Sequence, residues 1–331
     1  MRLRVGITYN LKKDFAPSDD QPIDAFEEFD AEETIDAIRH VLEGDGHEVT
    51  KLGGDTGLID RLRKNPVDIV FNIAEGHGGR NREAHIPALL EFLGIPYTGS
   101  DPLTLSLTLD KSAAKRVLVS EGIPTPGFKK VERLEDLEGL TLRYPLFVKL
   151  CHEGSSKGVR LDSKVSDLPS LKKKTGWLLE TYRSPVLVEE FIQGPEFTVG
   201  ILGNKAPSVL GVMQIEIKGV SPSEAIYSLE VKREWEEKVQ YLCPPPIDSS
   251  LLKRIEKVAL RSYKVLECRD VSRVDIRVGV DGEAYFLEVN PLPGLSPLYG
   301  DLPIMAKRMN WSYAQLVRTI FHHALKRNGL M

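Results

Sequence analysis

The sequence has little cysteine and no long apolar run. Only three of its 331 residues are cysteines, and none of them stands in a Cys-x-x-Cys pair. Isolated cysteines in odd number are most simply free thiols, which indicates a reducing compartment. No apolar segment approaches the ~20 residues that a membrane-spanning helix needs. The opening MRLRVGITYN leads into a β-like segment rather than a signal peptide. We therefore expect a cytoplasmic protein with no membrane partner.

An excess of positive charge is lacking as well. The 44 lysines and arginines are outnumbered by 48 aspartates and glutamates, which gives a net charge of −4. This balance argues against nucleic acid as a partner. With 41% hydrophobic and 28% charged residues and no internal repeat, the chain is expected to be globular. Its length predicts two or three domains.

Strands and helices alternate over residues 1–103, which predicts an open parallel α/β sheet as the first domain. Asp30 is expected to cap the first helix, with Glu33 completing a capping box. Loops at the strand ends of such a sheet are available for ligands. The expected strands are 3–9, 47–52, 67–72 and 96–98, and the expected helices are 30–42, 58–64 and 84–93.

Two further domains of mixed α+β type are expected, at residues 104–188 and 189–331. The first would contain one helix over 104–121, strands at 128–131, 145–149 and 186–191, and helices at 134–137 and 168–174. The second would contain strands at 196–202 and 207–217, a loop over 218–242, a helix at 249–266, a hairpin at 273–290 and a helix from Ser312.

The hairpin RVDIRVGVDGEAYFLEVN carries the most informative pattern. Apolar and polar residues alternate on both sides of Asp281-Gly282, a pair typical of a two-residue type I′ turn. A turn centred there places Val274 opposite Val289 and Ile276 opposite Leu287 on one face. The other face then presents the pairs Asp275–Glu288 and Arg273–Asn290.

Two directly opposed carboxylates repel each other at a Cβ separation of about 5 Å. A shared proton or a bound cation would relieve this repulsion. With the amide oxygen of Asn290 beside them, Asp275 and Glu288 form an all-oxygen set that suits a hard divalent ion such as Mg²⁺. The alternative is an exposed face whose acids point into water, and the hairpin alone leaves both open.

Three upstream segments carry weaker signals. The glycine-flanked run EGSSKG at 153–158 follows Lys149, and backbone N–H groups in such a run can cradle phosphate. An ordinary surface loop would look similar. Lys111 lies on an expected helix, where most lysines are solvated. The segment 186–199 resembles a strand that could pair with an adenine edge, or an inter-domain linker.

In this order, these segments resemble the ATP-grasp superfamily and, within it, the D-alanine–D-alanine ligases. The resemblance rests on LLEFLGIPYTGSDPLTLSLTLDKSAAK, YPLFVKL, EGSSKG, VEEFIQGPEFTV, the hairpin and PLPGLSPLYGDLP. It covers the chain from about Asp68 and is looser in the first domain. It implies an ATP-grasp fold, in which an open parallel α/β domain precedes two α+β domains that enclose ATP.

The resemblance also implies site residues. Lys111 and Lys149 match lysines that hold ATP phosphates, and Lys232 matches one that reaches the γ-phosphate. Arg273 and Gly294 match groups that stabilise the acyl-phosphate and tetrahedral oxyanions. The loop residues Glu153, Gly154, Ser155, Ser156 and Gly158 match a loop that closes over the phosphates, and Ser155 is also assigned a catalytic part. Nucleotide contacts are implied for Glu189, Phe191, Ile192 and Glu196, and metal contacts to two Mg²⁺ ions, which Mn²⁺ can replace, for Asp275, Glu288 and Asn290.

The implied activity is an ATP-dependent ligase. A carboxylate attacks the γ-phosphate, and an amine then displaces phosphate from the acyl phosphate. The substrates would be two small amino acids, and the closest interpretation of the resemblance makes both of them D-alanine. The chain is also expected to be either a monomer or a homodimer. The alternatives are a ligase for other amino acids or a hydroxy acid, and a non-catalytic nucleotide-binding regulator.

The sequence departs from the family where the family binds its amino acids. The segment 10–29 lacks the glycine-rich motif whose glutamate orients the first D-alanine, and residues 75–83 replace an HGxxGEDG loop. Arg233 stands where a tyrosine is expected and Tyr299 where a serine is expected. In the loop, the basic residues His77, Arg80 and Arg82 would either bind a substrate carboxylate or form a solvated surface.

Overall fold

The computed structural model describes residues 2–15 and 22–331. Its first layer is a three-stranded parallel sheet in the order β2-β1-β3, as the alternating pattern predicts. The expected fourth strand is present only as an isolated bridge between Val70 and Tyr97. The elements are β1 (Arg4–Thr8), α1 (Glu32–Gly44), β2 (Glu48–Lys51), α2 (Leu58–Lys64), β3 (Ile69–Asn72) and α3 (His85–Phe92).

The capping prediction for α1 is wrong. The N-cap residue is Ala31, which makes no side-chain capping bond. Asp30 instead forms a β-bridge with Leu11, so its backbone is fixed by the segment that precedes it. The expected loop 10–29 lies partly outside the described residues, and its described part contains the short 3₁₀ turn η1 (Lys12–Asp14).

The single helix expected over 104–121 is two helices, α4 (Pro102–Leu109) and α5 (Lys111–Ser120). They break at Asp110, whose carboxylate accepts a hydrogen bond from the Ala113 N–H at 3.0 Å. An aspartate that caps a helix in this way satisfies an N–H that has no partner within the helix. The break places Lys111 in the first turn of α5.

The second layer is an antiparallel sheet in the order β4-β7-β5-β6. The helix α6 (Leu168–Tyr182) is longer than expected and packs its buried Leu171 and Leu178 against the strand residues Leu146 and Val148. The strands are β4 (Phe128–Val131), β5 (Leu146–Leu150), β6 (Lys164–Val165) and β7 (Val186–Glu190), with 3₁₀ turns η3 (Leu134–Leu137) and η4 (Leu161–Ser163).

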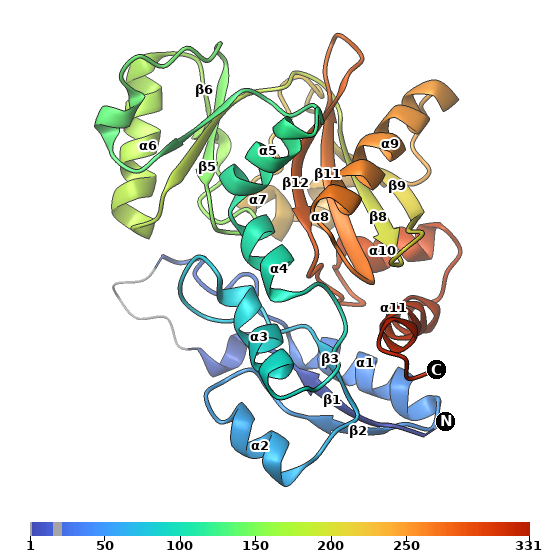
Figure 1. Cartoon of the computed structure of the whole chain (residues 1–331). Helices are drawn as coiled ribbons and strands as arrows, with labels where there is room; N and C mark the ends of the chain where they lie inside the picture. Colours follow the sequence, from blue (N-terminus) through green and yellow to red (C-terminus); the bar gives the residue numbers. More distant parts are fainter. Residues whose placement is uncertain (1, 16–21) are drawn as a thin grey trace.

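The third layer is an antiparallel sheet in the order β10-β9-β8-β11-β12, which faces the second layer in Figure 1. The loop expected over 218–242 is wrong, because it contains two short helices and the edge strand β10. The elements are β8 (Glu196–Leu202), β9 (Ser208–Ile217), α7 (Leu229–Arg233), α8 (Trp235–Lys238), β10 (Val239–Leu242), α9 (Ser249–Val265), β11 (Val271–Val278), β12 (Ala284–Asn290), α10 (Asp301–Arg308) and α11 (Tyr313–Arg327).

The hairpin β11–β12 confirms the pair that matters for the metal hypothesis. Asp275 lies opposite Glu288, and Arg273 lies opposite Asn290. The turn prediction is wrong, because Gly282 has a φ of +77° while Asp281 is not among the residues with positive φ. A type I′ turn requires positive φ at both positions.

A register shift follows Asp275, so that Ile276 pairs with Phe286 and not with Leu287. The shift leaves Leu287 as an extra residue, which is the definition of a β-bulge. Phe286 is therefore buried in the core, at 1% exposure, and Leu287 turns to the opposite face with Glu288.

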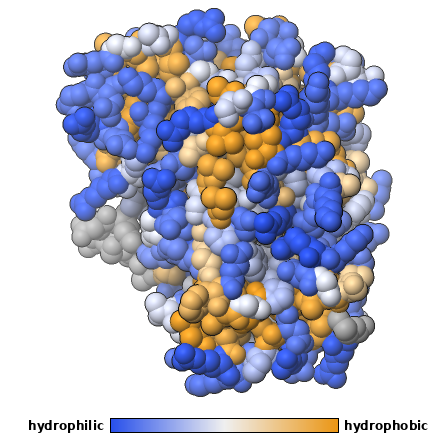
Figure 2. All heavy atoms as spheres, in the orientation of Figure 1, coloured by the Kyte–Doolittle hydropathy of each residue, from blue (hydrophilic) through white to orange (hydrophobic). Residues whose placement is uncertain are grey.

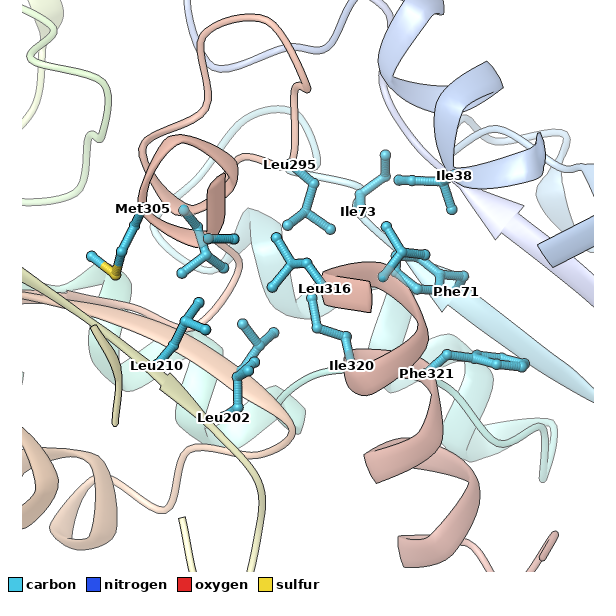
Figure 3. Close-up of a cluster of buried hydrophobic side chains, with 14 of the residues drawn as sticks. Ile38, Phe71, Ile73, Leu202, Leu210, Leu295, Met305, Leu316, Ile320 and Phe321 are labelled. Atoms are coloured by element: carbon cyan, nitrogen blue, oxygen red, sulfur yellow. The ribbon is translucent and has the colours of Figure 1, made fainter. Parts of the chain in front are cut away.

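One core joins the first layer to the third. In Figure 3, Phe71 of β3 and Ile73, which directly follows this strand, face Leu316 and Ile320 of α11, which also pack toward Leu202. Each sheet falls within one of the predicted segments 1–103, 104–188 and 189–331, except that β7 crosses residue 188, and these boundaries stay a prediction.

The face drawn in Figure 2 is mostly hydrophilic, with apolar patches in its middle and lower parts. Over residues 2–15 and 22–331, no helix has the length and apolar character needed to cross a membrane.

Candidate active site

Two adjoining pockets gather almost all of the predicted site residues. The inter-sheet pocket lies between the four-stranded and five-stranded sheets, and the adjoining pocket continues from it toward the parallel sheet. Of the site residues that the family resemblance implies, only Gly158 lines neither pocket. The inter-sheet pocket is lined by Lys111, Lys149, Glu153, Gly154, Ser156, Glu189, Phe191, Ile192, Glu196, Lys232, Arg273, Asp275 and Glu288. Ser155, Asn290 and Gly294 line only the adjoining pocket.

A buried lysine that sequence reasoning missed lies behind Lys149. Lys115 is fully buried on α5, and its Nζ lies 2.9 Å from Glu189 Oε2, while Lys149 Nζ lies 2.7 Å from Glu189 Oε1. Burial acts to raise the pKa of Glu189, but the two lysines outweigh it and lower that pKa. Burial also lowers the pKa of Lys115 to about 8. The available signal was spacing, because Lys111 and Lys115 stand one helical turn apart.

Lys111 reaches from the start of α5 to the hairpin. Its Nζ donates a 2.5 Å hydrogen bond to the Glu153 carbonyl and lies 3.5 Å from Glu288 Oε2. Burial would raise the pKa of Glu288, yet Lys111, Lys149 and other cations lower it to about 2. Glu288, whose side chain is 24% exposed, is therefore ionised at neutral pH.

Asp275 is surrounded by donors. Thr198 Oγ1 donates to it at 2.7 Å, Asn290 Nδ2 at 3.1 Å, and Arg273 through two nitrogens at 3.1 and 3.2 Å. Arg273 also lies 3.3 Å from Asp301, an acid at the start of α10 that sequence reasoning did not select. The guanidinium of Arg273 is thus fixed between two carboxylates.

The set Asp275, Glu288 and Asn290 consists of two carboxylates and one amide. Among the described residues, no three His, Cys, Asp or Glu side chains are grouped to hold a metal ion, so the amide has to supply the third ligand. Asn290 donates through Nδ2, and its amide oxygen accepts no hydrogen bond from the described part of the chain. Oxygen ligands of this kind fit Mg²⁺.

The glycine loop 153–158 is tied down by the segment that precedes α1. Glu28 accepts hydrogen bonds from the Gly154 N–H, from Lys157 at 2.7 Å and from Arg82 at 2.7 Å. Asp24 accepts from the Gly158 N–H at 2.9 Å. Burial would raise the pKa of Glu28, but its cationic partners lower that pKa to about 2.

These bonds change what the loop can offer to a phosphate. The N–H groups of both flanking glycines are already bound to carboxylates, so the cradle is left to Ser155 and Ser156. Their φ values of 48° and 58° lie in the left-handed region, which non-glycine residues adopt at a cost of about 1–3 kcal/mol. Backbone strain of this kind is concentrated at ligand-binding loops.

The strand expected to bind adenine and the residues that follow it also line the inter-sheet pocket. The Phe191 N–H is bonded to the Pro145 carbonyl at 2.9 Å and is not free, whereas the Ile192 N–H donates to no carbonyl among the described residues. Glu196 faces Arg277, which sequence reasoning missed, with 3.5 Å between the charged atoms. The Arg277 guanidinium also lies 4.4 Å from the Phe191 ring centroid and packs against one face of this ring.

The basic loop 75–83 resolves into three separate environments. The solvated alternative describes His77 and Arg80, which are exposed, but not Arg82. Arg82 is buried and bound to Glu28, and its second nitrogen donates to the His152 carbonyl at 2.7 Å. His77 packs beside Phe15, with ring centroids 5.3 Å apart. Arg80 is exposed. None of these three basic residues lines either pocket.

Comparison with known proteins matches this arrangement to one family. A family model described as "D-ala D-ala ligase C-terminus" matches residues 117–322. A D-alanine–D-alanine ligase of Carboxydothermus hydrogenoformans is 35% identical over 87% of this chain and 91% of its own length. The chain belongs to the D-alanine–D-alanine ligase family.

Other relatives agree with this assignment. The uncharacterized protein y4sG of Sinorhizobium fredii is 34% identical over 89% of each chain. The crystal structure of a D-alanine–D-alanine ligase from Bacillus anthracis complexed with ATP superposes with a TM-score of 0.76 at 25% identity, and it covers 99% of both chains. The expected ATP-grasp fold and the expected ATP-dependent ligase that forms a peptide bond are therefore both confirmed.

Proposed function

We propose that the chain uses ATP to join the carboxylate of one small amino acid to the amine of another, by way of an acyl phosphate. The observation that carries this proposal is the wall shared by the two pockets. A phosphoryl group that leaves a nucleotide in the inter-sheet pocket would cross this wall to a carboxylate in the adjoining pocket. The side chains that line both pockets include Lys111, Lys232, Arg273, Glu288 and Asp301.

The lysines would bind and orient the phosphates. Lys111 and Lys149 are each held by a carboxylate of the chain, and Lys232 lies 5.1 Å above the Tyr227 ring. Ammonium groups placed beforehand stabilise the charge that spreads over the transferred phosphoryl oxygens. Exchange of a protein carboxylate for a phosphate oxygen would keep Lys111 and Lys149 paired at every stage.

Arg273 would stabilise the oxyanions of the second half-reaction. Its position is fixed by Asp275 and Asp301 before any substrate binds, so little reorganisation is needed when charge develops. Gly294 lines the adjoining pocket beside it, and a Cβ added at Gly294 would meet no atom within 4 Å. Substrate can therefore approach this backbone closely.

The magnesium ions that the family implies would be held by Glu288, Asn290 and Asp275. The opposed carboxylates and the amide oxygen fit such an ion, although Asp275 would have to release one of its donors. A bound Mg²⁺ would neutralise charge on the phosphate oxygens. The chain itself contributes an ionised, half-buried Glu288 and the exclusion of water by the glycine loop, which protects an acyl phosphate from hydrolysis.

The first substrates to test are two D-alanines, the pair for which the relatives above are named. The departures at Arg233 and Tyr299 concern the amino-acid side of the site, since both residues line only the adjoining pocket. Arg233 is already bound to Glu27 at 2.5 Å, so it offers no free charge to a substrate carboxylate. Other amino acids therefore remain candidates.

The test is a screen for ADP release over amino acids of both hands, with mass spectrometry of the products. We expect release that depends on Mg²⁺ and on a carboxylate–amine pair. Tight ATP binding without turnover by any pair would refute the ligase and favour a nucleotide-binding regulator. A homodimer and a cytoplasmic location stay predictions, and light scattering of the purified chain would test the first.

A further inference from the structure

The adjoining pocket contains three carboxylates that the proposed chemistry does not use. Asp30, Glu75 and Glu83 line it on the side of the parallel sheet, and we call them the acidic wall. Within residues 2–15 and 22–331, none of the three forms a salt bridge. Glu83 is only 9% exposed, and its carboxylate accepts no hydrogen bond from the described residues.

The cations nearest to the acidic wall are already bound elsewhere. Arg82, adjacent to Glu83 in the chain, donates to Glu28 and to the His152 carbonyl. Lys111 is held by the Glu153 carbonyl and Glu288. A buried carboxylate without a partner is costly, by several kcal/mol in real proteins. The described part of the chain therefore supplies no cation that forms a salt bridge with the acidic wall.

The pKa values of the wall agree with this shortage. Burial raises the pKa of Asp30 to about 7 and that of Glu83 to about 7, and burial with repulsion from Glu83 raises that of Glu75 well above its usual value. Glu28, which lies in the same region but has cationic partners, shifts in the opposite direction. Arg82 and Lys111 also act to lower the pKa of Glu83, but they do not outweigh its burial, whereas the cationic partners of Glu28 do.

An ammonium group fits the wall better than a metal ion does. The three carboxylates are not grouped closely enough for metal binding, as far as the described residues show. The pocket extends from this wall to Lys111 and Arg273, so a substrate carboxylate at the shared wall would point its other end toward the acids. The α-ammonium of a bound amino acid would pair with one carboxylate of the wall, and a second ammonium at the end of its side chain would pair with another.

We propose that the acidic wall selects a diamino acid as one of the two substrates, with the side-chain ammonium bound by Glu83. This inference rests on the proposed ligase function and specifies its substrate class. The energetic reason is that a cation from the substrate pairs Glu83, a buried carboxylate that has no partner among the described residues. Amino acids with uncharged side chains of the same length would leave it unpaired.

The experiment compares matched substrates on the full-length chain with Mg²⁺ and ATP. Each pair differs only in the terminal ammonium: diaminopropionate against alanine, ornithine against norvaline, and lysine against norleucine, in both hands. We expect at least one diamino member to have a kcat/KM more than tenfold above that of its uncharged partner. Equal values in all pairs, with ADP release intact, would overturn this inference and leave the ligase function standing. Absence of ADP release with every amino acid would overturn both.

Variants locate the effect in the wall. Glu83→Gln keeps the shape and removes the charge, and we expect it to reduce the preference to within threefold without changing the KM for ATP. The control is Glu135→Gln, an exposed glutamate on η3, which should leave the preference unchanged. If Glu83→Gln fails to fold, Asp30→Asn replaces it. A preference that survives removal of charge from the wall in a folded variant would refute the assignment.

Discussion

Replacing Glu28 by glutamine should loosen the glycine loop. The Glu28 side chain is 5% exposed and receives two charged donors, Lys157 and Arg82, as well as the Gly154 N–H. The amide of glutamine keeps the shape and one acceptor oxygen but loses the charge. Removal of one partner from a buried ion pair costs about 3–5 kcal/mol.

The lowered pKa of Glu28 gives a second measure of the free energy that its ion pairs contribute to folding. A fall in the Glu28 pKa from 4.5 to about 2 corresponds to about 3 kcal/mol of stability at neutral pH. Because the folded pKa is lowered, this stability is present above about pH 4.5 and is lost as the pH falls toward 2. Glu153, 3.0 Å from Lys157, compensates in part, so we expect the variant to lose about 2 kcal/mol.

Two assays measure the loss. The melting temperature at pH 7 should fall by about 3 °C, and the difference from the parent should shrink between pH 4.5 and 3. Trypsin should cleave after Lys157 more than tenfold faster, because local opening exposes this bond. The control is Glu27→Gln, whose pair with Arg233 is partly exposed and should contribute no more than about 1 kcal/mol. Equal melting and equal cleavage of Glu28→Gln and the parent would refute the tether.

Three further outcomes are expected. Glu288→Gln should reduce Mg²⁺-dependent ADP release at least 100-fold while its circular dichroism spectrum stays unchanged, and parental turnover would remove Glu288 from the site. Lys115→Met should destabilise the chain by about 3 kcal/mol in urea unfolding, since Glu189 loses one of two buried cations; an unchanged midpoint would contradict the pairing. Gly158→Ala should slow turnover and raise the KM for ATP, because the residue has a φ of +70° and its new Cβ would lie 2.7 Å from a Leu178 carbon; kinetics like the parent's would show that the loop does not need this conformation.

The facing pair Asp275 and Glu288 could be predicted from the sequence because strand periodicity is local and a hairpin has short contacts. The turn itself could not be predicted, since Asp281-Gly282 is also compatible with a longer loop that a bulge corrects. The order of the lysines and the glycine loop indicated the family before any coordinates were known.

Residues whose function depends on distant partners were missed. Lys115, Arg277 and Asp301 look like ordinary helix or strand charges until Glu189, Glu196 and Arg273 are placed beside them. Asp30 shows the converse error. Its sequence context favours a helix cap, but pairing with Leu11 fixes its backbone first.

The extra residue in β12 has a consequence for how this chain can vary. The pairs Asp275–Glu288 and Ile276–Phe286 are those of an uninterrupted ladder from which Leu287 has been left out. The strand could therefore lose Leu287, or carry a different residue there, without separating the two acids or moving Phe286 out of the core. Leu287 contributes to the shape of the inter-sheet pocket, and the sheet does not depend on it. A residue can be lost or kept at this single position to suit the shape of the bound nucleotide, while Asp275 and Glu288 stay opposite each other.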